Sequence, residues 1–107
     1  MSVINQWEQA EPGGVKRKIH RPGNKVMMME VVFEKGAEGS SHHHPHEQLT
    51  YCLEGKLAFQ VDEKEIVIEK GETIHIPSNA VHGVKALEPS KLLDVFTPPL
   101  REDLLKE

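Results

Sequence analysis

The sequence predicts a small all-β domain in which two sheets stack or close into a barrel. Three observations lead to this fold class: short β-rich runs follow one another closely, turn-forming residues separate them, and the one helical candidate is a short tail. The chain has 107 residues, which suits one domain because a second core would need roughly another 50 to 100 residues. Strands this short can bury a shared interior only by stacking or closing, which also limits exposed edges.

The expected strands begin at Val26 and are rich in β-branched and apolar residues: Val26–Glu34, Gln48–Leu53, Lys56–Val61, Glu65–Glu69, Thr73–Ile76, Val81–Ala86 and Lys91–Phe96. The breaks between them contain residues that supply positive φ, fixed φ or local side-chain hydrogen bonds, at positions 54–55, 62–64, 70–72, 77–79 and 88–90. We expect a single domain with its barrel at residues 26–97, an N-terminal arm at 1–25 and a short tail at 98–107. Within the tail, residues 101–107 are the helical candidate.

Composition excludes several classes of function. The formal charge of -4, the pI near 6.0 and an aromatic content of 5% argue against nucleic-acid binding, which needs a basic face and stacking aromatics. No apolar run approaches the roughly 20 residues of a membrane-spanning helix, and the N-terminus shows no secretory signal. Cys52 is the single cysteine, so an intrachain disulfide is impossible. We therefore expect a cytoplasmic protein with no membrane or nucleic-acid partner.

Two features leave alternatives open. The run Met27–Phe33 and the strand Glu65–Glu69 are apolar on both faces for part of their length, which fits either burial on both sides or a subunit interface. A homodimer is the expected assembly. The basic cluster Lys16–Lys18, with His20 and Arg21 nearby, is either a solvated strand edge or a patch that draws an anionic small molecule toward a pocket.

Four of the seven histidines gather just before Gln48. On a strand, alternate side chains face the same way, so His42 and His44 project together. Gln48 has the same parity but would lie about 13 Å beyond His44 on a straight strand, so the chain must bend, and Pro45 suits such a bend. His82 follows a turn on a later strand that a barrel would bring alongside. The alternative is a solvated histidine-rich loop that binds no metal.

The wider pattern resembles the two sequence motifs of the cupin superfamily. The first is glycine, five residues, His-x-His, three or four residues, an acidic residue, six residues and glycine, and it is met at Gly36, His42, His44, Gln48 and Gly55, with Gln in place of Glu. The second is glycine, five residues, Pro-x-Gly, two residues, His, three residues and Asn, and it is met at Gly71, Pro77 and His82, with Asn79 and Ala86 as departures. Asn79 is a mild departure because asparagine tolerates the left-handed conformation.

This resemblance implies a small single-domain jelly-roll β-barrel, the double-stranded β-helix of cupins. It also implies one divalent transition metal, Ni, Zn, Fe or Mn, held by His42, His44, Gln48 and His82. A neutral amide at position 48 leaves the site without an anionic protein ligand. The ion then keeps its full double charge for a bound carboxylate, hydroxide or enolate.

The end of the chain looks like the closing segment of the KdgF-like pectin-degradation cupins, with Asp94-x-Phe96 on the last strand and Arg101 soon after. That resemblance implies the opening of 4,5-unsaturated uronates to linear keto forms, a net isomerisation of a small carboxylated sugar. Asp94 would be the general acid and base, Phe96 would shape the substrate-binding wall, and Arg101 would pair with the substrate carboxylate. Arg101 departs from the family pattern because it stands one residue further from Asp94.

Other functions and roles remain open at this stage. A neutral, histidine-rich site could carry Fe(II) or Mn(II) with free positions for oxygen, as in a dioxygenase. A non-catalytic module that binds or senses a small molecule is the third possibility. Asp94 could equally be a structural carboxylate at the barrel rim, Phe96 a core residue, and Arg101 a solvated charge on the tail.

Overall fold

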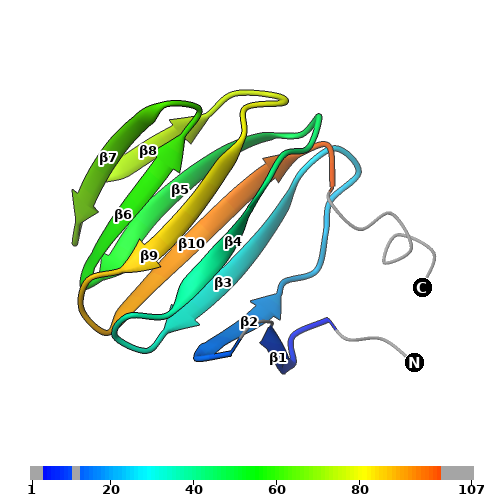
Figure 1. The fold of residues 1–107 in the computed structure, drawn as a ribbon. Coiled ribbons are helices and arrows are strands. Elements are labelled where there is room, and N and C mark those ends of the chain that lie inside the picture. The colour runs from blue at the N-terminus through cyan, green and yellow to red at the C-terminus, as the bar shows by residue number, and fades with distance from the viewer. Residues whose placement is uncertain (1–3, 11–12, 100–107) are drawn as a thin grey trace.

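The computed structural model describes the chain apart from residues 1–3, 11–12 and 100–107 (Figure 1). The described residues form ten β-strands and no helix. In chain order the strands are β1 (Trp7–Ala10), β2 (Val15–Ile19), β3 (Met27–Phe33), β4 (Glu38–His42), β5 (Glu47–Glu54), β6 (Lys56–Val61), β7 (Lys64–Glu69), β8 (Thr73–Ile76), β9 (His82–Ala86) and β10 (Ser90–Thr97). The helical candidate at residues 101–107 lies outside the described residues.

The strands make two antiparallel sheets that enclose one interior. The larger sheet has the order β1-β2-β3-β10-β5-β8, and the smaller has the order β4-β9-β6-β7. Strands distant in sequence are therefore neighbours, since β10 lies between β3 and β5. This arrangement confirms the predicted all-β jelly roll: from β3 to β10 the chain crosses between the facing sheets at every connection except the β6–β7 hairpin.

Alternation along the central strands separates the core from the outside. In β3, Met27, Met29, Val31 and Phe33 point inward and are buried. β10 follows the same pattern, and its register places Asp94 beside Met29 on one side and Thr50 on the other. Asp94 and Thr50 therefore form a polar pair within a row of buried apolar residues. They mark the part of the interior that polar side chains line.

Three strands lie outside the runs that the sequence predicted. β1 and β2 form an antiparallel hairpin that continues the larger sheet beside β3, within the segment described above as an N-terminal arm. β4 has the polar sequence Glu-Gly-Ser-Ser-His and becomes a strand by pairing with β9. Its own β propensity is weak, so the tertiary pairing decides its conformation.

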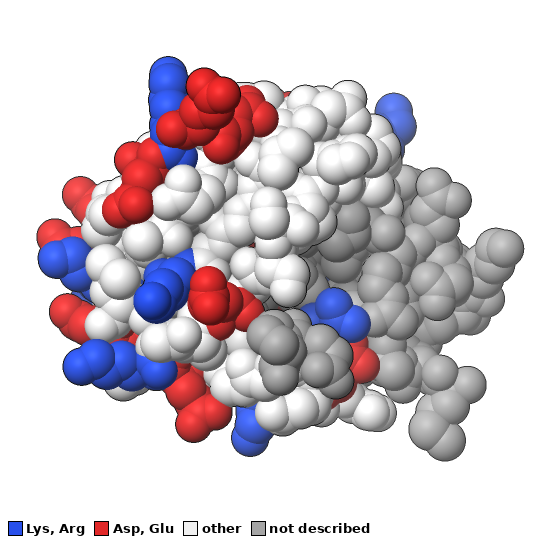
Figure 2. All heavy atoms as spheres, in the orientation of Figure 1, with Lys and Arg blue, Asp and Glu red and all other residues white. Residues whose placement is uncertain are grey.

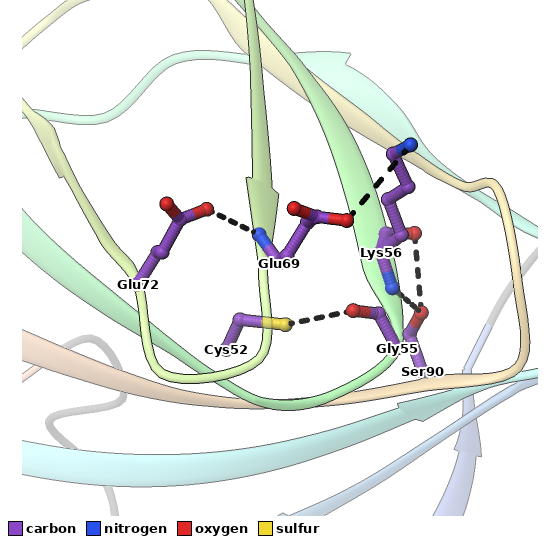
Figure 3. Close-up of polar contacts among 6 residues, drawn as sticks. All are labelled: Cys52, Gly55, Lys56, Glu69, Glu72 and Ser90. Carbon is purple, nitrogen blue, oxygen red and sulfur yellow. Dashed lines mark hydrogen bonds and ion pairs between the residues drawn. The ribbon is translucent and has the colours of Figure 1, made fainter.

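Polar contacts close the end of the barrel where β5 turns into β6 (Figure 3). The Ser90 hydroxyl accepts a hydrogen bond from the Lys56 backbone N–H at 3.0 Å, and the Glu72 carboxylate accepts one from the Glu69 N–H at 2.8 Å. Gly55 has φ of 84°, and a side chain there would collide with Ser90. The histidine cluster lies at the opposite end of β5, which begins at Glu47.

The outer face of the larger sheet carries exposed apolar side chains. Met28 on β3, Leu49 and Tyr51 on β5 are exposed, Leu49 by 54%. The register brings Val95 of β10 between Met28 and Leu49, so these side chains form one continuous surface. The sequence left two explanations for the apolar residues on both faces of Met27–Phe33, burial on both sides or a subunit interface. The outward residues are not buried within the chain, so the subunit interface is the explanation that stays open.

Charged side chains are mixed on the face drawn in Figure 2. Lys and Arg are interspersed there with Asp and Glu rather than gathered into a patch of one sign. Within the described part of the chain, no helix has the length and hydropathy needed to cross a membrane.

Candidate metal centre

Three histidines converge at the end of the barrel where β4 ends and β9 begins. The ligand nitrogens of His42, His44 and His82 lie within 4.8 Å of one another. His42 and His82 are direct cross-strand partners in the β4–β9 pair. His44 reaches the same point because the chain bends at Pro45 and His46 before β5 starts. An ion with bonds of about 2.1 Å keeps its ligand atoms about 3 to 4 Å apart, so small ring movements would close this group around one ion.

Backbone carbonyls fix the orientation of all three rings. The Nδ1 atom of His42 lies 2.8 Å from the Ser40 carbonyl oxygen, and that of His82 lies 2.9 Å from the Ala80 oxygen. His44 Nδ1 lies 3.1 Å from the carbonyl oxygen of His46. A carbonyl only accepts, so each Nδ1 carries a proton, and in a neutral imidazole of this tautomer Nε2 holds the lone pair. This is the arrangement that metal-binding imidazoles use.

The buried nitrogen of His44 points to a missing partner. His44 Nε2 is buried and has no hydrogen-bond partner among the described residues. Burial lowers the pKa of His44 below its ordinary value, while the hydrogen bond to His46 and the nearby Gln48 side chain oppose that decrease. Burial likewise lowers the pKa of His82, although the hydrogen bond to the Ala80 carbonyl opposes the decrease. Neutral rings with directed lone pairs fit a divalent cation, because a cation would satisfy the orphaned nitrogen.

Gln48 lies at the start of β5, buried beside the histidines. Its amide nitrogen donates to Thr50 Oγ1 at 2.9 Å and to Asp94 Oδ1 at 3.0 Å. Both donor positions of the amide are thereby used. The carbonyl oxygen Oε1 is the atom left to bind a cation.

Asp94 is a buried carboxyl whose environment favours a proton. Its Oδ1 accepts hydrogen bonds from Gln48 and from the Thr50 hydroxyl, the latter at 2.5 Å. Burial raises the pKa of Asp94 to about 7, although the hydrogen bonds from Thr50 and Gln48 lower it. A carboxyl that titrates near neutral pH is suited to moving protons. Thr50 was missed by the sequence analysis, although its place two residues after Gln48 on one strand puts it on the same face.

A cavity of about 390 Å³ joins these groups. Its polar lining includes His42, Gln48, His82 and Asp94, and apolar side chains such as Phe96 form the rest. The Phe96 ring meets the His44 ring edge-on, with centroids 5.8 Å apart. A cavity of this size suits a small organic molecule. Arg17 also lines it, and the sequence analysis did not name Arg17 as a site residue.

Of the other histidines, His46 lies beside His44, with ring centroids 5.3 Å apart, and its Nδ1 is also buried without a hydrogen-bond partner among the described residues. His75, His43 and His20 lie elsewhere. His75 is exposed and its Nε2 is 2.7 Å from the Glu47 carboxylate, while His43 is exposed at the bend. His20 Nε2 contacts Glu30 at 2.9 Å, on the outer side of the larger sheet. Arg101, which the resemblance assigned to the substrate carboxylate, lies outside the described residues.

Comparison with known proteins identifies the class. Residues 29–96 match the cupin domain family, which is more than half of the chain. The chain belongs to the cupin domain family, as its two motifs predicted, and the three-histidine cluster is consistent with the metal site of such a protein.

Within this class, the chain is similar to KdgF proteins. It is 36% identical over 101 residues to the pectin degradation protein KdgF of Dickeya dadantii, covering 92% of this chain and 90% of that protein. The structure of KdgF from Halomonas superposes with a TM-score of 0.84 at 33% identity, over 92% of this chain and 90% of that one. An RmlC-like cupin from Shewanella frigidimarina gives a TM-score of 0.82 at 31% identity, over 96% and 94% of the two chains.

Proposed function

We propose that this protein is a metal-dependent enzyme that opens 4,5-unsaturated uronates to linear keto acids. The observation that carries the proposal is the convergence of three imidazole nitrogens at a cavity that His42, His82 and the buried carboxyl of Asp94 line. The similarity to a pectin degradation protein over 92% of the chain directs the choice of substrate. Unsaturated uronates are the small sugar acids that pectin or alginate lyases release.

His42, His44 and His82 would hold one divalent transition metal through Nε2, and Gln48 would add its Oε1. When bound, the ion supplies a Lewis acid that polarises a sugar oxygen. The four neutral ligands add no negative charge, so the positive charge of the site is kept for an anionic substrate. The Nδ1 hydrogen bonds keep the rings in place before the ion arrives, which lowers the cost of ordering them.

Asp94 would transfer the proton that the isomerisation requires. The ring form holds an enol ether between C4 and C5 and a hydroxyl at C1. Opening breaks the bond between C1 and the ring oxygen, the C1 hydroxyl loses its proton to give an aldehyde, and a proton is added at C4 as the C5 ketone forms. The formula does not change. Both hydrogen bonds from the protein reach Oδ1 of Asp94, so Oδ2 would carry the proton between the two positions.

The apolar wall would exclude water from the reacting ring. Phe96 packs against His44 and lines the cavity together with Phe33 and Leu92. In such surroundings a buried carboxyl keeps its raised pKa and interactions between charges are stronger than in water. The cavity volume of about 390 Å³ favours a single sugar ring over a polymer.

Turnover can be followed by the loss of the ultraviolet absorbance of the conjugated double bond of an unsaturated monouronate. We expect metal-loaded protein to accelerate this loss and Asp94→Asn to reduce the acceleration by about 100-fold or more, the usual contribution of a general acid or base. Asp62→Asn is the matched control, because Asp62 is exposed in the turn after β6. Failure of fully metal-loaded protein to accelerate the loss would reject this function.

We also propose that the protein is a cytoplasmic homodimer that binds no nucleic acid. The apolar surface formed by exposed Met28, Leu49 and Tyr51 around half-buried Val95 supports a second copy as its partner, since monomers rarely expose a continuous patch of such side chains. The free thiol of Cys52 and the net charge of -4 support the other two statements.

A further inference from the structure

The cavity contains a cation that the metal centre does not use. Arg17 lies in the middle of β2, on the same face as Val15 and Ile19, which are both buried. Side chains of this parity point into the barrel. Arg17 lines the same cavity as His42 and Asp94, and it is the only Lys or Arg among the described residues of the lining.

Alternation along β2 places the side chains of the basic cluster Lys16–Lys18 on two faces of the strand. Lys16 is exposed on the outer side, and Lys18 contacts Glu30 at 4.0 Å and lies 5.1 Å from the centre of the Trp7 ring. Arg17 points the other way. The cluster is therefore a solvated strand edge on one face and a cavity-lining cation on the other.

Glu8 contacts only the Nε atom of the Arg17 guanidinium and leaves its two terminal nitrogens available. The two residues are cross-strand partners in the β1–β2 hairpin, and Arg17 Nε donates to Glu8 Oε1 at 3.0 Å. Within the described ranges the Arg17 side chain makes no other hydrogen bond or ion pair, so Nη1 and Nη2 keep their N–H groups for another acceptor. A guanidinium with a restrained Nε and two available terminal nitrogens is suited to a carboxylate. The side chain is 36% exposed, so a ligand can reach it.

The position of Arg17 relative to Asp94 suits a small acid. Arg17 pairs with Val31, and Val31 pairs with Leu92 of β10, two residues before Asp94. Two strand spacings of about 4.8 Å and two residues of about 3.4 Å place the two Cα atoms about 12 Å apart. Arg17 Nε is held by Glu8 of β1, which lies on the opposite side of β2 from β3 and β10. A ligand that contacts both Arg17 and Asp94 must therefore span the cavity from β2 to β10.

We propose that Arg17 binds the carboxylate of the ligand and thereby selects sugar acids over neutral sugars. The proposal deepens the function given above and rests on it for the identification of the ligand as a uronate. Apolar neighbours in the lining, among them Val31 and Phe33, lower the local dielectric and strengthen a charge pair. Glu8 acts through Arg17 and is a positioning residue.

The test measures binding rather than turnover. The full-length protein is treated with EDTA, so that no metal competes for the carboxylate, and is titrated with D-galacturonate and with D-galactose. We expect Arg17→Met to raise the Kd for galacturonate at least about tenfold, as loss of a paired charge would, and to leave the Kd for galactose within about twofold. Lys16→Met is the matched control on the outer side of β2. Arg17→Lys keeps the positive charge but loses the two terminal nitrogens that bind a carboxylate together. Its Kd for galacturonate should lie between those of the wild type and Arg17→Met.

Several outcomes would overturn the proposal. These are an unchanged Kd for galacturonate in Arg17→Met, an equal loss for galacturonate and galactose, and no measurable binding of galacturonate by the wild-type protein. If Arg17→Met does not fold, as judged by circular dichroism, an unchanged Kd in Arg17→Lys overturns it instead. A wild-type protein that fails to turn over unsaturated uronates would reject the proposed reaction, while Arg17-dependent binding of galacturonate would still hold.

Discussion

The buried carboxyl of Asp94 makes the stability of the metal-free protein depend on pH. Burial raises the pKa of Asp94 from an ordinary 3.8 to about 7. Between these two values the native state binds more protons than the unfolded state. Stability therefore decreases as pH rises through this range, and the loss is complete above the folded pKa. Asp94→Asn removes the titration and keeps an amide oxygen that can accept the hydrogen bonds from Gln48 and Thr50.

The size of the effect follows from the two pKa values. Between pH 5 and pH 8 the linkage amounts to about 2 to 3 kcal/mol of unfolding free energy. The stability of Asp94→Asn relative to wild type should thus rise by that amount over this range, and the variant should be the more stable protein at pH 8. Comparing the two proteins at each pH cancels the contributions of all other titrating groups that the substitution leaves undisturbed.

Urea unfolding of EDTA-treated protein at a series of pH values measures this difference. Asp62→Asn serves as the control for the loss of one carboxylate, since the Asp62 side chain is exposed. If the difference in unfolding free energy between Asp94→Asn and wild type is the same from pH 5 to pH 8, the assignment of a protonated, buried carboxyl at this position is refuted.

Three further predictions concern the metal, the assembly and the closed end of the barrel. His44→Ala should lose bound metal, measured by inductively coupled plasma mass spectrometry after dialysis, whereas His43→Ala at the exposed bend should retain it. Leu49→Lys should convert a dimer to a monomer in size-exclusion chromatography with light scattering, because it places a charge in the exposed apolar surface. Gly55→Ala should destabilise the protein by about 2 kcal/mol or more in urea unfolding, since it combines positive φ with a collision, while Gly36→Ala has positive φ with open space around it and should cost about 1 kcal/mol.

The sequence was sufficient for the parts of the fold that depend on local pattern. A run of β-branched and apolar residues placed Met27–Phe33 on a strand, and its inward residues form core. Strand alternation placed His42 and His44 on one side of the chain, and His82 was expected beside them from a later strand, which the direct pairing of β4 with β9 provides. Asn79 has φ of 66°, as its place in the glycine position of the second motif required.

The features that the sequence did not reveal depend on tertiary pairing. β4 carries almost no apolar side chains and exists because β9 supplies its hydrogen bonds. Arg17 sits in a run of three basic residues for which the sequence left both a solvated edge and a patch beside a pocket open, and only the register of β2 shows which side chain points inward. Thr50 gains its role only through Asp94, which lies 44 residues away in the chain.

X-ray absorption at the metal edge of protein loaded with Zn(II) or Ni(II) tests the central claim most directly. The convergence of three Nε2 atoms predicts one ion per chain, with three imidazole nitrogens at about 2.1 Å and oxygen ligands completing the shell. Protein that binds no ion, or an ion whose spectrum lacks the scattering of several imidazole rings, would contradict it.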